Sequence, residues 1–187
     1  MGIAEDLHML MPLKCMFDTN VFNRILDGEL RIAEIADRMK AYTTHIQRDE
    51  ISNTKNDERR TALLKTFEEV IFGSEPTESF VVGTSRIGEA RLGGGQSVPT
   101  SSAVWGVSRW GKANWGREDN LYSTIKAELD QLNRSKPNNI QDALIAETSI
   151  KNNLVLITTD SDLSTVTKRY GGTCLSVEEL WKRCTDS

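Results

Sequence analysis

The feature that most constrains the fold is an apolar run late in the chain, Leu154–Thr158 (LVLIT). A strand that is hydrophobic at successive positions, rather than at alternate ones, is covered on both faces, which is typical of a central strand in a parallel sheet. Strand-like runs also occur at Leu13–Asp18, Ala41–Ile46 and Thr173–Val177. Helical segments separate these runs, and the alternation predicts an α/β fold with a mainly parallel sheet.

Apolar residues recur near helical spacing between the strands. The predicted helices are Glu29–Lys40, Gln47–Phe72, Glu118–Asn133, Asn139–Asn152, Ser161–Arg169 and Val177–Cys184. In Gln47–Phe72 the polar stretch Asn53–Asp57 allows an interruption. Asn138 has a glutamine three positions later, Gln141, and this capping-box spacing predicts a helix start.

The length of 187 residues suits one domain with an excursion. We therefore expect residues 1–187 to form a single domain, with an irregular Gly/Trp-rich insertion at 73–117. The three cysteines show no metal-ligand spacing, which favours reduced thiols in the cytoplasm over a zinc site or a disulfide framework. No apolar run approaches the ~18 residues of a membrane span.

The net charge of −4 is unusual for a protein that binds nucleic acid, because phosphate contacts demand a basic face. Carboxylates gathered to hold divalent cations would reconcile an acidic balance with such a role. Asp18, Asp160 and Asp162 directly follow predicted strands, Glu50 lies about one helical turn past the end of another, and Asp142 lies in the first turn of a predicted helix. Ligands of open parallel sheets bind outside the carboxyl ends of the strands, so four segments could deliver acids to one edge.

Each acid also has a structural interpretation. Asp142 in a first helical turn is favoured by the helix dipole. Asp160 or Asp162 could cap the next helix, and Glu50 could be an exposed helix residue. Asp18 is harder to explain in this way, since a carboxylate that ends an apolar strand loses hydration and needs a partner.

Four motifs occur in order along the chain: FDTN, HIQRDE, IQDALIAE and LITTDSD. Together they resemble the PIN-domain (PilT N-terminus-like) nucleases, a family of metal-dependent ribonucleases that includes many bacterial toxins. The resemblance covers about residues 13–72 and 118–184 and leaves the middle unmatched. It implies a three-layer α/β/α fold around a mainly parallel sheet.

The resemblance also implies roles for residues of this chain. Those that match the family's acidic, metal-binding and catalytic positions are Asp18, Glu50, Asp142, Asp160 and, as a fifth, Asp162. Polar residues that would support them are Thr19, Asn20 and Thr159. Asp49 competes with Glu50, because one helical residue turns a side chain by ~100° and only one of the two can face the site. We choose Glu50, which Ile46 and Ile51 flank toward the sheet.

The function that the resemblance implies is endoribonuclease activity with toxin-like character, in which metal-activated water hydrolyses RNA phosphodiester bonds. Oxygen ligands without His or Cys favour Mg²⁺ or Mn²⁺, and such ions can activate water and offset phosphate charge. The expected partners are RNA, an antitoxin or other protein, and a second copy of the chain. The alternative is an inactive PIN-like module that binds RNA or protein. A haloacid-dehalogenase-type phosphatase fits less well, since Asn20 replaces its second aspartate.

Trp-Gly pairs recur in the middle segment at intervals of five residues. The segment also carries an excess of basic residues, and aromatics interleaved with cations suit stacking on bases and pairing with phosphates. The residues predicted to bind nucleic acid are Trp105, Arg109, Trp110, Lys112 and Trp115. Other interpretations stay open: tryptophans that pack on the domain surface, a flexible loop, or a surface that recruits a protein partner.

Overall fold

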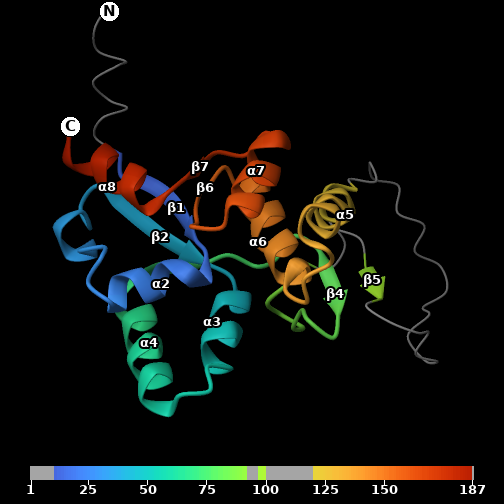
Figure 1. Ribbon diagram of the computed structural model, residues 1–187, viewed down its shortest axis with the longest axis horizontal. Helices are drawn as coiled ribbons and strands as arrows, with labels where there is room; N and C mark the ends of the chain where they lie inside the picture. The colour runs from blue at the N-terminus through green and yellow to red at the C-terminus, as the bar shows by residue number, and fades with distance from the viewer. Residues whose placement is uncertain (1–10, 92–96, 100–119, 187) are drawn as a thin grey trace, which may run out of the picture.

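The computed structural model describes residues 11–91, 97–99 and 120–186. Residues 97–99 are described by their backbone alone. Its main feature is a five-stranded sheet in which all neighbouring strands are parallel, in the order β3-β2-β1-β6-β7 (Figure 1). The strands are β1 Leu13–Phe17, β2 Met39–Thr43, β3 Ile71–Ser74, β6 Val155–Ile157 and β7 Cys174–Leu175. A separate parallel pair joins β4 Phe80–Val82 to β5 Ser97–Pro99.

Helices connect the strands, as crossover connections between parallel strands require. They are α2 Thr19–Leu26, α3 His45–Ser52, α4 Asp57–Val70, α5 Leu121–Asn133, α6 Asn139–Lys151, α7 Ser161–Arg169 and α8 Val177–Thr185, with the short 3₁₀ helix η1 Ile32–Glu34. Among the residues that the structure describes, no helix is both long and apolar enough to cross a membrane.

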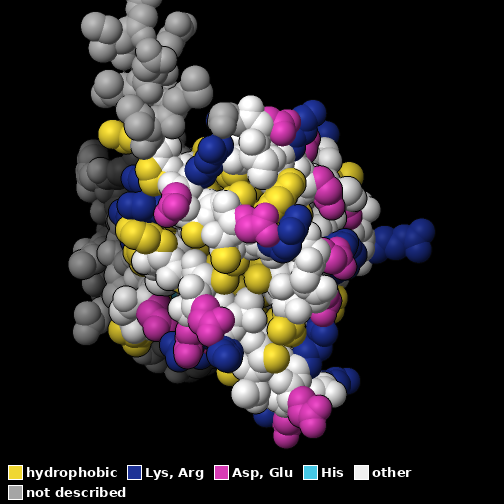
Figure 2. Space-filling view, turned by 90° about the vertical axis from the view of Figure 1, so that its left-hand side faces the viewer, with side chains coloured by type: hydrophobic (Ala, Val, Ile, Leu, Met, Phe, Trp, Pro, Cys, Tyr) yellow, Lys and Arg dark blue, Asp and Glu magenta, His cyan; other side chains and the backbone are white. Residues whose placement is uncertain are grey.

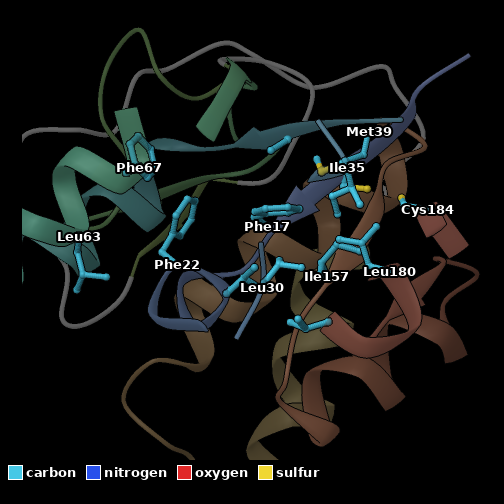
Figure 3. Packing of buried hydrophobic residues seen from close by; sticks show 14 of the residues in the cluster. Phe17, Phe22, Leu30, Ile35, Met39, Leu63, Phe67, Ile157, Leu180 and Cys184 are labelled. Atoms are coloured by element: carbon cyan, nitrogen blue, oxygen red, sulfur yellow. The ribbon is translucent and has the colours of Figure 1, made fainter. Parts of the chain in front are cut away.

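Side chains of β1 divide between two cores. Cys15 and Phe17 point into a core with residues of α2, α4 and α8, which includes Phe22 and Phe67 (Figure 3). Met16, between them, points to the opposite core with residues of α5, α6 and α7. This alternation places helices on both faces of the sheet (Figure 1). The predicted three-layer α/β/α architecture with a mainly parallel sheet is therefore confirmed.

Helix α6 is buried almost all round, although about half of its residues are polar or charged. Every residue from Asp142 to Ser149 is buried, and Ala143 to Ala146 contribute to the second core. Burial fixes the helix firmly, so the acid in its first turn has a defined position relative to the sheet.

Several sequence-based assignments differ from the structure. Glu29–Lys40 is not one helix: η1 covers only Ile32–Glu34, and β2 already begins at Met39, which pairs with Leu13 of β1. Apolar residues at near-helical spacing are instead buried by a winding connection, where Leu30 and Ile35 enter the first core. Sheet pairing and burial outweigh the local helical pattern here.

The long predicted helix over Gln47–Phe72 is two helices, α3 and α4, separated at the polar stretch where an interruption was allowed. Asn56 begins α4, and its side chain accepts a hydrogen bond from the Arg59 backbone at 2.8 Å. Asn138 does precede α6 but makes no side-chain capping bond. Within the segment predicted to be irregular, 73–117, Gly73 and Ser74 are instead the end of β3, and β4 and β5 pair with each other.

Candidate functional site

Asp18 lies at the carboxyl end of the central strand β1 and is 5% exposed. It caps α2, with Oδ1 accepting a 2.6 Å hydrogen bond from the Thr19 backbone. Its Oδ2 accepts from the Asn20 side chain and from the Thr158 hydroxyl, both at 2.5 Å. Burial raises the pKa of Asp18 to about 6, despite these hydrogen bonds, and the charge of Asp160 adds to the rise.

Glu50 is brought to Asp18 by the way α3 starts. Thr44 and Gln47 form a capping box, and the buried Gln47 amide donates a 2.8 Å hydrogen bond to the Phe17 carbonyl, next to Asp18. Glu50 is three residues after Gln47 and so lies on the same helix face. It accepts a hydrogen bond from the Thr19 hydroxyl. Burial raises the pKa of Glu50 to about 7, and the charges of Asp18 and Asp49 contribute.

Asp49 points elsewhere. Its carboxylate pairs with the Arg86 guanidinium, with Oδ1 and Nη2 2.6 Å apart. The choice of Glu50 over Asp49 therefore agrees with the geometry. Arg86 belongs to the described start of the glycine-rich segment, so this ion pair places that start beside the helix that carries Glu50.

Asp142, in the first turn of α6, is 7% exposed. Its Oδ2 accepts a 3.0 Å hydrogen bond from the Asn138 side chain. Burial raises the pKa of Asp142 to about 8, and the charges of Asp18, Glu50 and Asp160 raise it further, against the lowering effect of Lys136. The negative charges that act on Asp142 thus come from three different segments of the chain.

Asp160 and Asp162 form the outer side of the cluster. Asp160 caps α7, with Oδ1 accepting from the backbones of Asp162 at 2.8 Å and Leu163 at 3.0 Å. Its Oδ2 is turned instead toward the Lys136 ammonium, 3.9 Å away, and the Asp162 Oδ2 lies 4.0 Å from the same ammonium. The cap and the approach to Lys136 thus use different oxygens of one carboxylate.

Thr158 is the residue that sequence reasoning missed. Its hydroxyl is buried at the end of β6, where it donates to Asp18 and accepts from the Asp160 backbone at 3.0 Å and the Asn20 amide at 3.2 Å. Thr159, which was expected to support the site, has an exposed side chain and contributes its backbone N–H to Asn20 at 3.3 Å. A threonine that ends an apolar strand directly before two polar residues was the available signal.

The donor set fits a hard divalent cation in its chemistry, because it offers carboxylate oxygens whose mutual repulsion a cation would relieve. Within the described residues, no three His, Cys, Asp or Glu side chains come together as closely as metal ligands do. In this structure the acids accept hydrogen bonds from Thr19, Asn20, Asn138 and Thr158 instead of sharing one ion. Side-chain rotations would be needed for several acids to bind one ion.

The described start of the middle segment is anchored on α6. Ser79 donates to Glu147 at 3.0 Å, Asn152 donates to Glu78 at 2.9 Å, and Val81 is buried in the second core. The residues predicted to bind nucleic acid, Trp105, Arg109, Trp110, Lys112 and Trp115, lie outside the described residues.

Comparison with protein-family models and with curated proteins finds no match. Among solved structures, the chain is similar to VapBC2 from Rickettsia felis bound to a DNA fragment from its promoter, with 16% identity and a TM-score of 0.46. It is also similar to VapBC-5, of the VapBC family of toxin-antitoxin systems, from Mycobacterium tuberculosis (18%, 0.38), and to FitAcB from Neisseria gonorrhoeae (14%, 0.42). Each likeness covers 88% of this chain and 98% of the other.

Proposed function

We propose that the protein is a cytoplasmic, toxin-like endoribonuclease of the PIN type that hydrolyses RNA phosphodiester bonds with Mg²⁺ or Mn²⁺. The observation that supports this best is the environment of Asp142, which is buried and coupled electrostatically to Asp18, Glu50 and Asp160. Acids whose pKa values are raised by burial and by one another, at the carboxyl edge of a parallel sheet, are typical of a functional site.

The residues that would hold the metal are Asp18, Glu50, Asp142 and Asp160, with Asp162 at the rim. A bound divalent ion would supply Lewis acidity, lowering the pKa of water and offsetting charge on the phosphate. The supporting residues have separate tasks: Asn20 and Thr158 orient the Asp18 carboxylate, and Thr19 orients Glu50. Reduced thiols fit a cytoplasmic location, since all three cysteines are free and buried.

The products of cleavage distinguish this mechanism from one that uses the RNA 2′-hydroxyl. Attack by water with departure of the 3′-oxygen leaves a 5′-phosphate and a 3′-hydroxyl, and no covalent enzyme intermediate forms. We expect these ends when labelled single-stranded RNA, structured RNA and single-stranded DNA are incubated with the protein and Mg²⁺ or Mn²⁺. In ¹⁸O-labelled water, the label should enter the 5′-phosphate. A 2′,3′-cyclic phosphate would contradict the mechanism, and metal-dependent cleavage of DNA alone would contradict the substrate class.

The alternative, a PIN-like module that binds RNA or protein without cutting, predicts a different pattern. It would bind RNA equally well in EDTA and in Mg²⁺, and it would cleave no member of the substrate panel. The raised pKa values of three acids favour the enzyme, because a binding module gains nothing from gathered like charges.

Thr158 and Thr159 provide a matched pair of variants. Thr158→Val removes the hydroxyl that donates to Asp18, whereas Thr159→Val changes an exposed neighbour. Because residues that orient metal ligands typically affect affinity about 10- to 100-fold, we expect Thr158→Val to weaken Mn²⁺ binding by about tenfold. Thr159→Val should change it less than about twofold. Titration calorimetry measures both, and equal effects would contradict the assignment of Thr158.

The middle segment is proposed to hold the RNA strand beside the acids. Support comes from its described start, where Arg86 pairs with Asp49 one residue from Glu50. Replacing Arg109, Lys112 and the three tryptophans Trp105, Trp110 and Trp115 together should weaken RNA binding by at least about tenfold, since stacking contributes about 1–3 kcal/mol per base. Filter binding in EDTA measures this without cleavage. RNA affinity equal to that of the wild type would remove the proposal.

A protein partner is proposed for the face of the molecule that carries α2 and α4, on the other side of the sheet from α5, α6 and α7. An apolar groove of about 980 Å³ lies among α2, β2, α4 and β3, and Phe72 beside it is 59% exposed. Figure 2 shows hydrophobic side chains exposed among charged ones on the face that is at the left in Figure 1. We propose a second copy of the chain as the occupant, with an antitoxin-type protein as the alternative. Light scattering that gives a monomer mass would contradict the homodimer.

A further inference from the structure

Lys136 stands out because its positive charge faces the carboxylate cluster. The ammonium lies 3.9 Å from the Asp160 Oδ2 and 4.0 Å from the Asp162 Oδ2. It also lowers the pKa of Asp142, so its charge reaches the centre of the cluster. Neither distance is that of a hydrogen bond, and the side chain is 46% exposed. The ammonium is thus held by charge alone and can leave easily.

The loop that carries Lys136 has a defined conformation that hydrogen bonds hold in place. Arg134 and Ser135 both adopt positive φ angles, 60° and 56°, which is rare for residues with side chains. The buried Asn139 holds the loop closed: its amide donates to Asp130 at 2.7 Å and to Asn133 at 2.8 Å. The Lys136 carbonyl accepts from the Asn139 backbone at 3.1 Å. These bonds direct residue 136 to the edge of the cluster.

A cation at this place has a clear electrostatic effect. Gathered carboxylates repel one another, and a nearby positive charge offsets part of that repulsion. A divalent ion would do the same more strongly and from a shorter distance. Two cations at one cluster also repel each other, so an ion that binds the acids must work against the lysine unless the flexible side chain moves away.

We propose that Lys136 is the resident counter-cation of the carboxylate cluster: it stabilises the acids while no metal is bound and competes with a divalent ion for them. The lysine therefore sets how much metal the site needs. This inference rests on the proposed metal site, and it assigns to Lys136 a role in metal affinity that is separate from cleavage.

The test uses the full-length protein with a charge series at one position: Lys136→Arg, Lys136→Met and Lys136→Glu. The matched control is Arg134→Met, which removes the same charge two residues away in the same exposed loop. Thermal unfolding in EDTA at neutral pH and low salt measures the stabilising role. Mn²⁺ binding, followed by electron paramagnetic resonance of the free ion, measures the competition.

We expect Lys136→Met to lower the melting temperature in EDTA by about 1–4 °C relative to Arg134→Met, the scale of a partly exposed ion pair in a domain of this size. Its Mn²⁺ dissociation constant should fall about three- to tenfold, with a larger fall in Lys136→Glu and little change in Lys136→Arg. The temperature difference should shrink in high salt.

Two results would overturn the inference: melting in EDTA that is the same for Lys136→Met and Arg134→Met, or Mn²⁺ affinity that is unchanged or weaker in Lys136→Met. The proposed function fails in a different way, since there the wild-type protein would bind no Mn²⁺ at all. The unfolding series in EDTA would then decide by itself whether Lys136 stabilises the acids.

Discussion

Asp142→Asn is expected to slow RNA cleavage by roughly a thousandfold, the scale on which loss of one preorganised electrostatic group acts. The charges of Asp18, Glu50 and Asp160 all raise the pKa of Asp142, so its own charge matters to any ion held among these acids. The amide keeps the shape of the side chain and an oxygen that can accept from Asn138. The variant should therefore fold normally, and single-turnover cleavage at saturating Mg²⁺ measures the loss.

Asp162→Asn is the matched control for that experiment. The Asp162 side chain is half-buried at the rim; among the described residues its carboxylate lies 4.0 Å from the Lys136 ammonium, and its backbone N–H donates to Asp160. Its replacement should cost less than about tenfold, since exposed ion pairs contribute little. A loss at Asp162 as large as that at Asp142 would show that the centre of the site lies nearer the start of α7.

The second large effect concerns stability without metal. Burial first, and neighbouring acids second, raise the pKa values of Asp18, Glu50 and Asp142 to about 6, 7 and 8. In the unfolded chain such acids titrate near pH 4. Between about pH 4 and pH 8 the folded state thus binds more protons than the unfolded state, and the free energy of unfolding falls as pH rises. The stability from these protonated acids is complete below about pH 4 and lost above about pH 8.

Asp142→Asn removes one of these buried charges. In EDTA at pH 8 we expect the variant to be more stable than the wild type by about 2 kcal/mol, since one pKa unit corresponds to about 1.4 kcal/mol. The two proteins should converge near pH 4, and saturating Mn²⁺ should stabilise the wild type alone. Urea unfolding across this pH range measures the difference. A variant that is less stable than the wild type at pH 8 in EDTA would contradict the electrostatic description.

Four of the five strands of the main sheet and most of its helices could be predicted because their signals are local, whereas the edge strand β3 was missed. LVLIT is apolar enough to require cover on both faces, and β6 forms within it at Val155–Ile157. Helix α7 has the bounds predicted for it, Ser161–Arg169, because Asp160 caps it directly. The acids at strand ends could be identified for a related reason, since the order of strands and acids along the chain determines which edge they reach.

One local signal was present but unused. Thr44 and Gln47 have the spacing of a capping box, which predicts that a helix starts at His45 rather than at Gln47. A helix that starts there, with Gln47 turned inward, places Glu50 on the inner face and Asp49 to the side. The sequence could therefore have decided between the two acids without the structure.

Other features depend on contacts between distant residues and had no local signal. Arg86 and Asp49 are 37 positions apart, and Thr158 and Asp18 are 140 positions apart. Glu29–Lys40 has helical spacing, yet pairing of β2 with β1 and burial of Leu30 and Ile35 determine its structure. The position of Lys136 depends on two residues with positive φ that are not glycine, which composition does not indicate.

The most direct test of the metal-dependent nuclease is cleavage of single-stranded RNA by protein stripped with EDTA, before and after Mg²⁺ or Mn²⁺ is added back, with Asp142→Asn prepared in parallel. We predict no cleavage by the stripped wild type, full recovery with either ion, and almost none by the variant under any condition. Cleavage that persists in EDTA, or that is equal in the wild type and the variant, would contradict the account.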